Sequence, residues 1–158
     1  MSEWIAEHSS LPYFISTDIS QFDMRRIHTW LSNSYWARGI PLDIVKRSFD
    51  HALSFGVFDQ GGAQVGCARM ITDRATFAYL ADVYLEESCR GKGIGRWMMD
   101  VIMAHEDLQG LRRIMLATSD MHPLYRQVGF TDLNKPEIMM EISVPDIYSR
   151  HRADKALP

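Results

Sequence analysis

The sequence predicts an α/β fold with a mixed sheet, in which the central strands form an antiparallel meander. Two observations lead to this class. Segments with strand and helix periodicity follow one another in the order β-α-α-β-β-β-α-β-α-β. The three strands in the middle of that order are separated by turn residues and not by helices, which argues against a doubly wound parallel sheet.

The first half of the chain predicts one strand followed by two helices. Residues 11–16 form the strand, and Asp18 or Ser20 offers an N-cap for the first helix. Apolar residues share one face of that helix, at Phe22, Ile27, Trp30 and Leu31. Pro41 suits the first turn of the second helix, because that position leaves its amide unpaired in any case.

The second half predicts a hairpin, a long strand and a helix that starts in a glycine-rich loop. The turn at residues 60–62 joins strands at 55–58 and 64–71. A strand over residues 76–85 then leads into the loop, and the helix after it extends to about His105. The remaining predicted elements are a strand at 112–118, a short helix at 122–127 and a last strand at 138–144.

Composition favours an ordinary globular domain. The chain has 158 residues, of which 46% are apolar and 23% charged, and we expect one domain over residues 1–158. The net charge of −3 argues against a nucleic-acid partner. Neither a membrane span nor a signal peptide is evident, so we expect a cytoplasmic protein with no membrane partner. Cys67 and Cys89 suggest neither a disulfide framework nor a zinc site, and no metal is expected.

The segment from Asp82 to Arg96 carries the strongest functional signal. Its three glycines, Gly91, Gly93 and Gly95, lie between a strand and a helix, where several backbone amides become available to an anion. The basic side chains Arg90, Lys92 and Arg96 add positive charge. This arrangement predicts a phosphate or pyrophosphate site.

The spacing of the glycines excludes two common phosphate-binding loops. A P-loop would need Ser or Thr after Lys92, where this chain has Gly93, and a dinucleotide fingerprint would need a third glycine where Arg96 stands. The pattern [QR]-x-x-G-x-[GA] fits instead, filled by Arg90, Gly93 and Gly95. It resembles the acyl-CoA pyrophosphate loop of the GNAT superfamily of acetyl-CoA-dependent N-acetyltransferases.

A second motif in the right order strengthens this resemblance. Residues 124–130 are similar to the family's L-Y-x-x-x-G-F signature, with Leu124, Tyr125, Gly129 and Phe130 in place. Further similar stretches occur at residues 65–73 and 111–118, and the resemblance covers a core of about residues 11–145. It implies the GNAT acyl-CoA N-acyltransferase fold and acetyl-CoA as co-substrate.

The resemblance assigns cofactor contacts position by position. Pantetheine would lie where the strand carrying Val83, Tyr84 and Leu85 separates from the strand at 112–118. The pyrophosphate would lie on the loop backbone formed by Arg90, Gly91, Lys92, Gly93, Ile94, Gly95 and Arg96. His122 would contact the cofactor or cap a helix, and we expect Cys89 to be exposed beside the phosphates.

Direct transfer of an acetyl group from a thioester to an amine requires a neutral amine. A lysine-like ammonium must lose its proton first, at a cost of about 4.6 kcal/mol at pH 7. Asp82 is the candidate base, acting directly or through water; alternatively it is a structural carboxylate that caps a neighbouring turn or pairs with an arginine. Tyr125 matches the family's tyrosine, whose hydroxyl points to the CoA sulfur, and would protonate the leaving thiolate; alternatively it is a core tyrosine.

The acceptor side is predicted from aromatic residues. Tyr35 and Trp36, between the first two helices, would form a wall of the acceptor site with Phe77 and Tyr79, although aromatic residues also pack ordinary cores. The expected partner is a small-molecule amine, and a homodimer is possible. Alternatives are a protein or peptide N-acetyltransferase, a non-catalytic acyl-CoA-binding sensor and an aminoacyl-tRNA-acetylating toxin.

Overall fold

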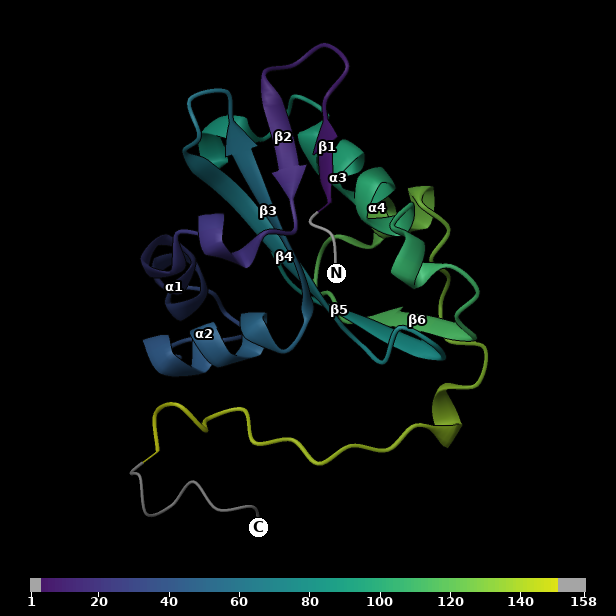
Figure 1. The fold of residues 1–158 in the computed structure, drawn as a ribbon. Helices are drawn as coiled ribbons and strands as arrows, with labels where there is room; N and C mark the ends of the chain where they lie inside the picture. The colour runs from purple at the N-terminus through teal and green to yellow at the C-terminus, as the bar shows by residue number, and fades with distance from the viewer. Residues whose placement is uncertain (1–3, 151–158) are drawn as a thin grey trace.

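A six-stranded sheet with the order β1-β2-β3-β4-β5-β6 runs through the computed structural model, which describes residues 4–150 (Figure 1). Neighbouring strands are antiparallel except β5 and β6, which are parallel. The predicted class, a mixed α/β fold with an antiparallel meander, is therefore confirmed. The strands are β1 (Ile5–Glu7), β2 (Tyr13–Ser16), β3 (Leu53–Asp59), β4 (Gln64–Thr72), β5 (Phe77–Leu85) and β6 (Arg113–Leu116).

Four helices cover the two faces of the sheet (Figure 1). On one face α1 (Met24–Ser32) and α2 (Leu42–Asp50) pack a cluster of buried side chains against Phe58 and Cys67 of the sheet. On the other face α3 (Ile94–Met103) and α4 (His122–Gln127) belong to a second cluster built on Phe55, Val57 and Met70. Short 3-10 turns occupy Ile19–Gln21, Glu87–Cys89, Glu106–Leu108 and Pro136–Ile138.

Most element boundaries follow local signals. The predicted short helix at 122–127 coincides with α4, and Pro41 is the residue immediately before α2. The cap of α1 is Asp23, whose side chain accepts a hydrogen bond from the Arg26 amide, whereas Asp18 caps the preceding 3-10 turn. Within residues 4–150, no helix has the length and apolar character needed to cross a bilayer.

The expected order of elements is wrong at both ends of the sheet. Residues 138–144, predicted as the last strand, are extended but pair with no strand among the described residues. At the other edge β1 adds a three-residue strand that pairs with β2. Periodicity identified residues 138–144 as strand-like, but it carries no information about which strand they could pair with. The strand β1 is too short to show periodicity.

Candidate active site

A cavity of about 1000 Å³ lies where β5 and β6 separate. The two strands pair from Phe77↔Arg113 to Leu80↔Leu116, and β6 ends there while β5 continues to Leu85. The continuing part of β5 therefore keeps one backbone edge unpaired and turned to the cavity. Val83, Tyr84 and Leu85, the strand residues expected to contact pantetheine, line this opening.

The glycine-rich loop closes one end of the cavity. Arg90, Gly91 and Gly95 line it, and the loop leads directly into α3. Gly91 and Gly93 have φ of +76° and +80°, a left-handed conformation that glycine adopts without strain. Gly93 caps α3 and has no side chain to bond the first-turn amides, so these donors are available to an anion.

The remaining loop residues differ in where their side chains lie. The side chain of Ile94 is buried in the core, so only its amide can reach a ligand. Arg96 pairs with Asp100 and donates to Gln127, with 3.1 Å between Arg96 Nε and Asp100 Oδ1. The cavity walls do not include Lys92, Gly93, Ile94 or Arg96. Arg90 is part of the wall, and its guanidinium lies over the Tyr84 ring, 5.5 Å from the ring centroid.

A β-bulge shapes the middle of the cavity. Between Cys67↔Tyr84 and Arg69↔Ala81, the register of β4 and β5 shifts, so that Ala68 faces two residues, Asp82 and Val83. Asp82 has φ of +54°, which is unusual outside glycine and turns its backbone out of the ladder. Burial raises the pKa of the Cys67 thiol, which stays protonated and donates to the Asp82 carbonyl at 3.4 Å.

The Asp82 carboxylate is held by two donors. Its Oδ2 lies 2.6 Å from Arg69 Nε, and its Oδ1 accepts a hydrogen bond from Trp36 Nε1 at 2.9 Å. The Asp82 side chain is only 7% exposed, so the carboxylate and the Arg69 guanidinium form a largely desolvated pair. The predicted pairing with an arginine is thus present, and the carboxylate still lines the cavity.

The segment between α1 and α2 forms the other end of the cavity. Tyr35 and Trp36 line it, as does Tyr79 of β5, and the Ser119 hydroxyl donates to the Tyr35 hydroxyl at 2.9 Å. The Trp36 bond to Asp82 and the Ser119 bond to Tyr35 fasten this segment to both sides of the opening. Phe77, predicted beside Tyr79, lies outside the cavity walls, at the first position of β5 and farthest along the strand from the opening.

Tyr125 reaches the cavity from α4. Its side chain is 92% buried, its ring packs edge-on against Phe130 with centroids 6.0 Å apart, and burial raises the pKa of its hydroxyl. Within residues 4–150 the hydroxyl makes no hydrogen bond, although it remains in contact with the cavity. His122, predicted to contact the cofactor or cap a helix, begins α4 and faces a separate groove along β6.

Sequence reasoning missed several cavity residues, among them Arg69 and Tyr148. Arg69 comes from β4, between the buried residues Ala68 and Met70, and although it lies in the similar stretch at 65–73 no role was assigned to it. Tyr148 comes from the C-terminal segment and packs near Gly39, 3.8 Å from where a Cβ on that glycine would lie. Burial and the Asp82 charge raise the pKa of Tyr148, which therefore stays protonated beside the carboxylate.

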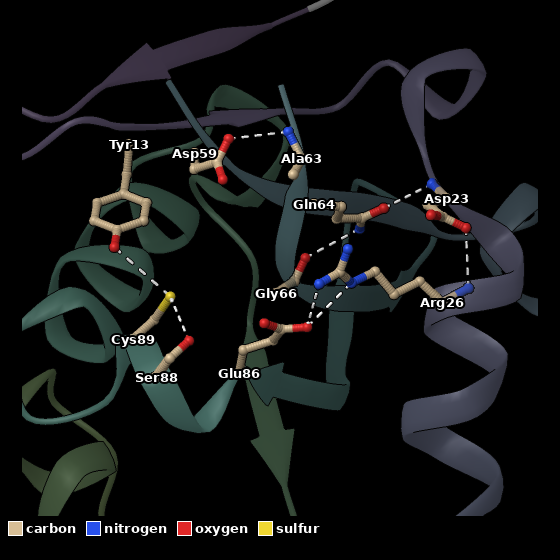
Figure 2. A network of polar contacts seen from close by, with 10 residues as sticks. All are labelled: Tyr13, Asp23, Arg26, Asp59, Ala63, Gln64, Gly66, Glu86, Ser88 and Cys89. Carbon is tan, nitrogen blue, oxygen red and sulfur yellow. Dashed lines mark hydrogen bonds and ion pairs between the residues drawn. The ribbon is translucent and has the colours of Figure 1, made fainter. Parts of the chain in front are cut away.

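The expectation for Cys89 is wrong. Its thiol is buried under the sheet, within 3.7 Å of the Tyr13 hydroxyl and 3.9 Å of the Ser88 hydroxyl (Figure 2). The loop turns at a 3-10 helix just before the glycines, and this turn directs the Cys89 side chain inward. The basic loop residues therefore have no exposed thiol next to them at this position.

Polar contacts on the neighbouring side fix α1 to the end of β5 (Figure 2). Arg26 donates from Nε and Nη2 to Glu86 Oε1 at 3.0 and 2.7 Å. Gln64 accepts from the Asp23 amide at 2.7 Å and donates to the Gly66 carbonyl at 3.0 Å. These bonds set the position of α1, and hence of the segment that carries Tyr35 and Trp36.

Comparisons with known proteins agree with this architecture. The model of the acetyltransferase (GNAT) domain matches residues 51–132, which include β3 to α4. A curated Gibberella zeae protein, FG08082, whose name assigns it provisionally to the acetyltransferases, is 33% identical over 155 residues. That alignment covers 84% of this chain and 86% of the fungal protein.

Solved structures show the same fold. The crystal structure of a Xanthomonas campestris pv. campestris protein, xcc2953, provisionally placed in the GNAT family, is 50% identical with a TM-score of 0.85. The match covers 89% of this chain and 100% of that one. A Clostridium acetobutylicum acetyltransferase, assigned by prediction and solved with acetyl-CoA, is 19% identical with a TM-score of 0.54, covering 89% and 98%. With its glycine loop, its opened strands and these relatives, the chain belongs to the GNAT acetyltransferase family.

Proposed function

We propose that this protein transfers the acetyl group of acetyl-CoA to a primary amine of a small molecule, by direct attack of the amine on the thioester. One observation carries the proposal: a single cavity extends from the α3 glycine loop, along the open edge of β5, to Asp82 and Tyr125. A cavity with the glycine loop at one end and Asp82 and Tyr125 at the other suits a cofactor with phosphates at one end and a reactive group at the other.

The protein's own groups bind the cofactor along this path. Loop amides and the α3 N-terminus hold the pyrophosphate, and the unpaired edge of β5 near Val83 and Leu85 bonds the amides of pantetheine as an added strand would. The acetyl-CoA complex of the Clostridium acetobutylicum protein, which has the same fold, supports this assignment.

Two residues move protons at the acceptor end. The Asp82 carboxylate takes a proton from the attacking amine, directly or through a water, while the nitrogen forms its bond to the acetyl carbon. As the carbon–sulfur bond breaks, the Tyr125 hydroxyl gives its proton to the thiolate. Because burial raises the pKa of Tyr125, the hydroxyl is protonated at neutral pH, as a proton donor must be.

Two hydrogen bonds that bridge the acceptor end of the cavity favour a small substrate over a peptide. The Tyr35–Ser119 and Trp36–Asp82 bonds hold the segment between α1 and α2 across the cavity, and Tyr148 adds a further wall. A peptide would need an open groove through this region. The aromatic rings suit an amine with an apolar or aromatic body.

Thiol release from acetyl-CoA tests the proposal, measured against arylalkylamines, amino acids, polyamines and aminoglycosides. We expect release that depends on one class of amine and falls by about 10²–10⁴ in Tyr125→Phe. Tyr13→Phe, which removes a hydroxyl outside the cavity, is the matched control and should retain full turnover. Tight acetyl-CoA binding with no release for any amine would instead indicate a sensor.

A further inference from the structure

Arg69 presents unpaired hydrogen-bond donors at the acceptor end of the cavity. Its Nε donates to Asp82 Oδ2 at 2.6 Å, whereas its Nη1 and Nη2 bond no group within residues 4–150. In that part of the chain no buried side-chain nitrogen lacks a partner, so both Nη atoms are accessible, and Arg69 is part of the cavity wall. A guanidinium that pairs through Nε keeps Nη1 and Nη2 as a fork that fits the oxygens of a carboxylate.

The Arg69 guanidinium is held in a fixed position. It lies over the ring of the fully buried Phe49, 5.9 Å from the ring centroid, and its side chain is only 17% exposed. The ion pair with Asp82 fixes the direction of the group. A donor that is already oriented and mostly desolvated loses little conformational entropy when it binds an anion. Arg69 is therefore pre-organised for a carboxylate on a ligand.

The neighbouring charges of Arg69 and Asp82 are complementary to those of an α-amino acid. Such a molecule carries its amine and its carboxylate on the same carbon atom. With its amine at Asp82, the proposed base, its carboxylate lies within reach of the adjoining Arg69 fork. Polyamines and simple arylalkylamines have no carboxylate and would leave these donors unmatched, which lowers affinity.

The other charged and titratable groups of the cavity do not compete for this position. Arg90 belongs to the glycine-loop end. Asp120 lies toward Tyr125, because burial raises the pKa of Tyr125 and the charges of Tyr35 and Asp120 add to that rise. Tyr148 lies near the ion pair: burial and Asp82 raise its pKa, while Arg69 opposes the rise. Its protonated hydroxyl is a further donor beside Arg69.

Large apolar side chains remain exposed in the same cavity. Tyr35 is 63%, Trp36 43% and Ile71 44% exposed, and all of them line the walls. Apolar side chains that gather around one cavity and stay in solvent indicate a ligand that covers them. The part of the acceptor beyond its amine and carboxylate is therefore expected to be apolar or aromatic.

We propose that the acceptor is an α-amino acid with an apolar or aromatic side chain, and that Arg69 binds its carboxylate. The amine lies at Asp82, and the side chain packs against Tyr35, Trp36 and Ile71. The products are an N-acetyl amino acid and coenzyme A. This inference rests on the acetyl transfer proposed above and adds to it a substrate class and a residue that determines specificity.

Matched substrate pairs that differ only in the carboxylate test the inference. The pairs are phenylalanine and 2-phenylethylamine, tyrosine and tyramine, tryptophan and tryptamine, and leucine and 3-methylbutylamine. For each pair, kcat/KM of the amino acid is divided by kcat/KM of the amine, so that a loss common to both substrates cancels. We expect the wild type to prefer the amino acid in at least one pair. A wild type that prefers the amine in every pair would overturn the inference.

Arg69→Lys shows whether the fork is responsible for this preference. Lysine keeps a positive charge for Asp82 but has no second pair of donors, so the ratio should fall by at least about tenfold, chiefly through KM of the amino acid. Arg74→Lys is the matched control: Arg74 pairs with Asp107 outside the cavity, and this variant should keep the wild-type ratio. An undiminished ratio in Arg69→Lys would refute the role of Arg69.

Binding separates this inference from the proposed function. The same amino acids and amines are titrated by calorimetry into the protein saturated with coenzyme A. Amine-dependent thiol release without any preference for a carboxylate would leave acetyl transfer intact and reject the amino acid. Binding of an amino acid that weakens in Arg69→Lys, with no thiol release for any amine, would reject acetyl transfer but support the carboxylate site. If no amino acid binds, the carboxylate site is wrong.

Discussion

Arg69 and Asp82 form an ion pair across the bulge between β4 and β5, with 2.6 Å between Arg69 Nε and Asp82 Oδ2. Both side chains are largely buried, and the pair forms part of the wall of the cavity. The bulge turns Asp82 toward Arg69, and Trp36 completes the set of donors. The Asp82 carboxylate, which is the proposed base, is therefore in contact with both Arg69 across the bulge and Trp36 of the segment between α1 and α2.

Arg69→Met should destabilise the protein by about 3 kcal/mol, because it leaves the Asp82 charge buried without its partner. Urea unfolding measures this loss. In Arg69→Met/Asp82→Asn, where no charge remains unpaired, part of the stability should return. An Arg69→Met variant as stable as the wild type would show that the pair adds nothing to the fold.

Asp82→Asn should lower kcat by about 10²–10³, since the amide keeps the shape of the side chain but cannot accept the amine proton. The pH profile of kcat should lose its acidic limb at the same time. Asp132→Asn is the control: it removes an exposed carboxylate outside this cavity and should leave kcat unchanged. Unchanged kcat in Asp82→Asn, with only reduced stability, would assign Asp82 a structural role.

Gly93→Val should weaken coenzyme A binding by at least about tenfold. A branched residue at φ of +80° is strained by roughly 1–2 kcal/mol or more, and relief of that strain would move the amides of the α3 N-terminus. Lys92→Ala, which removes only a side-chain charge, should cost less. Calorimetric titration with coenzyme A compares the two, and a larger loss in Lys92→Ala would contradict backbone binding.

Gly66→Ala should destabilise the sheet by about 1–3 kcal/mol, the usual range for overpacking. A Cβ at Gly66 would lie 2.8 Å from the Tyr84 carbonyl oxygen, beside the bulge, so β4 and β5 would have to move apart. Gly61→Ala, in the β3–β4 turn with no contact shorter than 3.4 Å, is the matched control and should unfold near the wild-type midpoint. Equal stability of both variants would refute the close approach.

Asp73 should make stability depend on pH in the acid range. The Thr76 hydroxyl, followed by the amides of Thr76, Ala75 and Phe77, lowers the pKa of this carboxyl well below its usual value. A lowered folded-state pKa gives stability that is present above about pH 4 and is lost as pH falls toward the folded value. Asp73→Asn should therefore show a flatter decline of melting temperature below pH 4 than the wild type. Asp50→Asn, on the exposed end of α2, is the control and should keep the wild-type decline.

The site could be predicted from sequence where a local requirement creates it. The glycine loop needs positive φ at Gly91 and Gly93 and a helix start after them, and both requirements appear as residue types at fixed spacing. Tyr125 follows from the signature at residues 124–130, and it reaches the cavity with Tyr35, Trp36 and Tyr79. Phe77 and His122 were predicted as site residues because of their neighbours in the sequence. Neither lines the cavity, because only part of β5 and part of α4 borders it.

The sequence by itself determined the fold class, the order of the central elements and the glycine-rich loop before α3, because periodicity, capping and glycine act over a few residues. Tertiary structure decided the bulge at Asp82, its pairing with Arg69, the place of Tyr148 and the burial of Cys89. Each of these depends on strand register or on contacts between distant segments. Residues 138–144 illustrate the difference, since alternation marks them as a strand but only the arrangement of the sheet determines where a strand can pair.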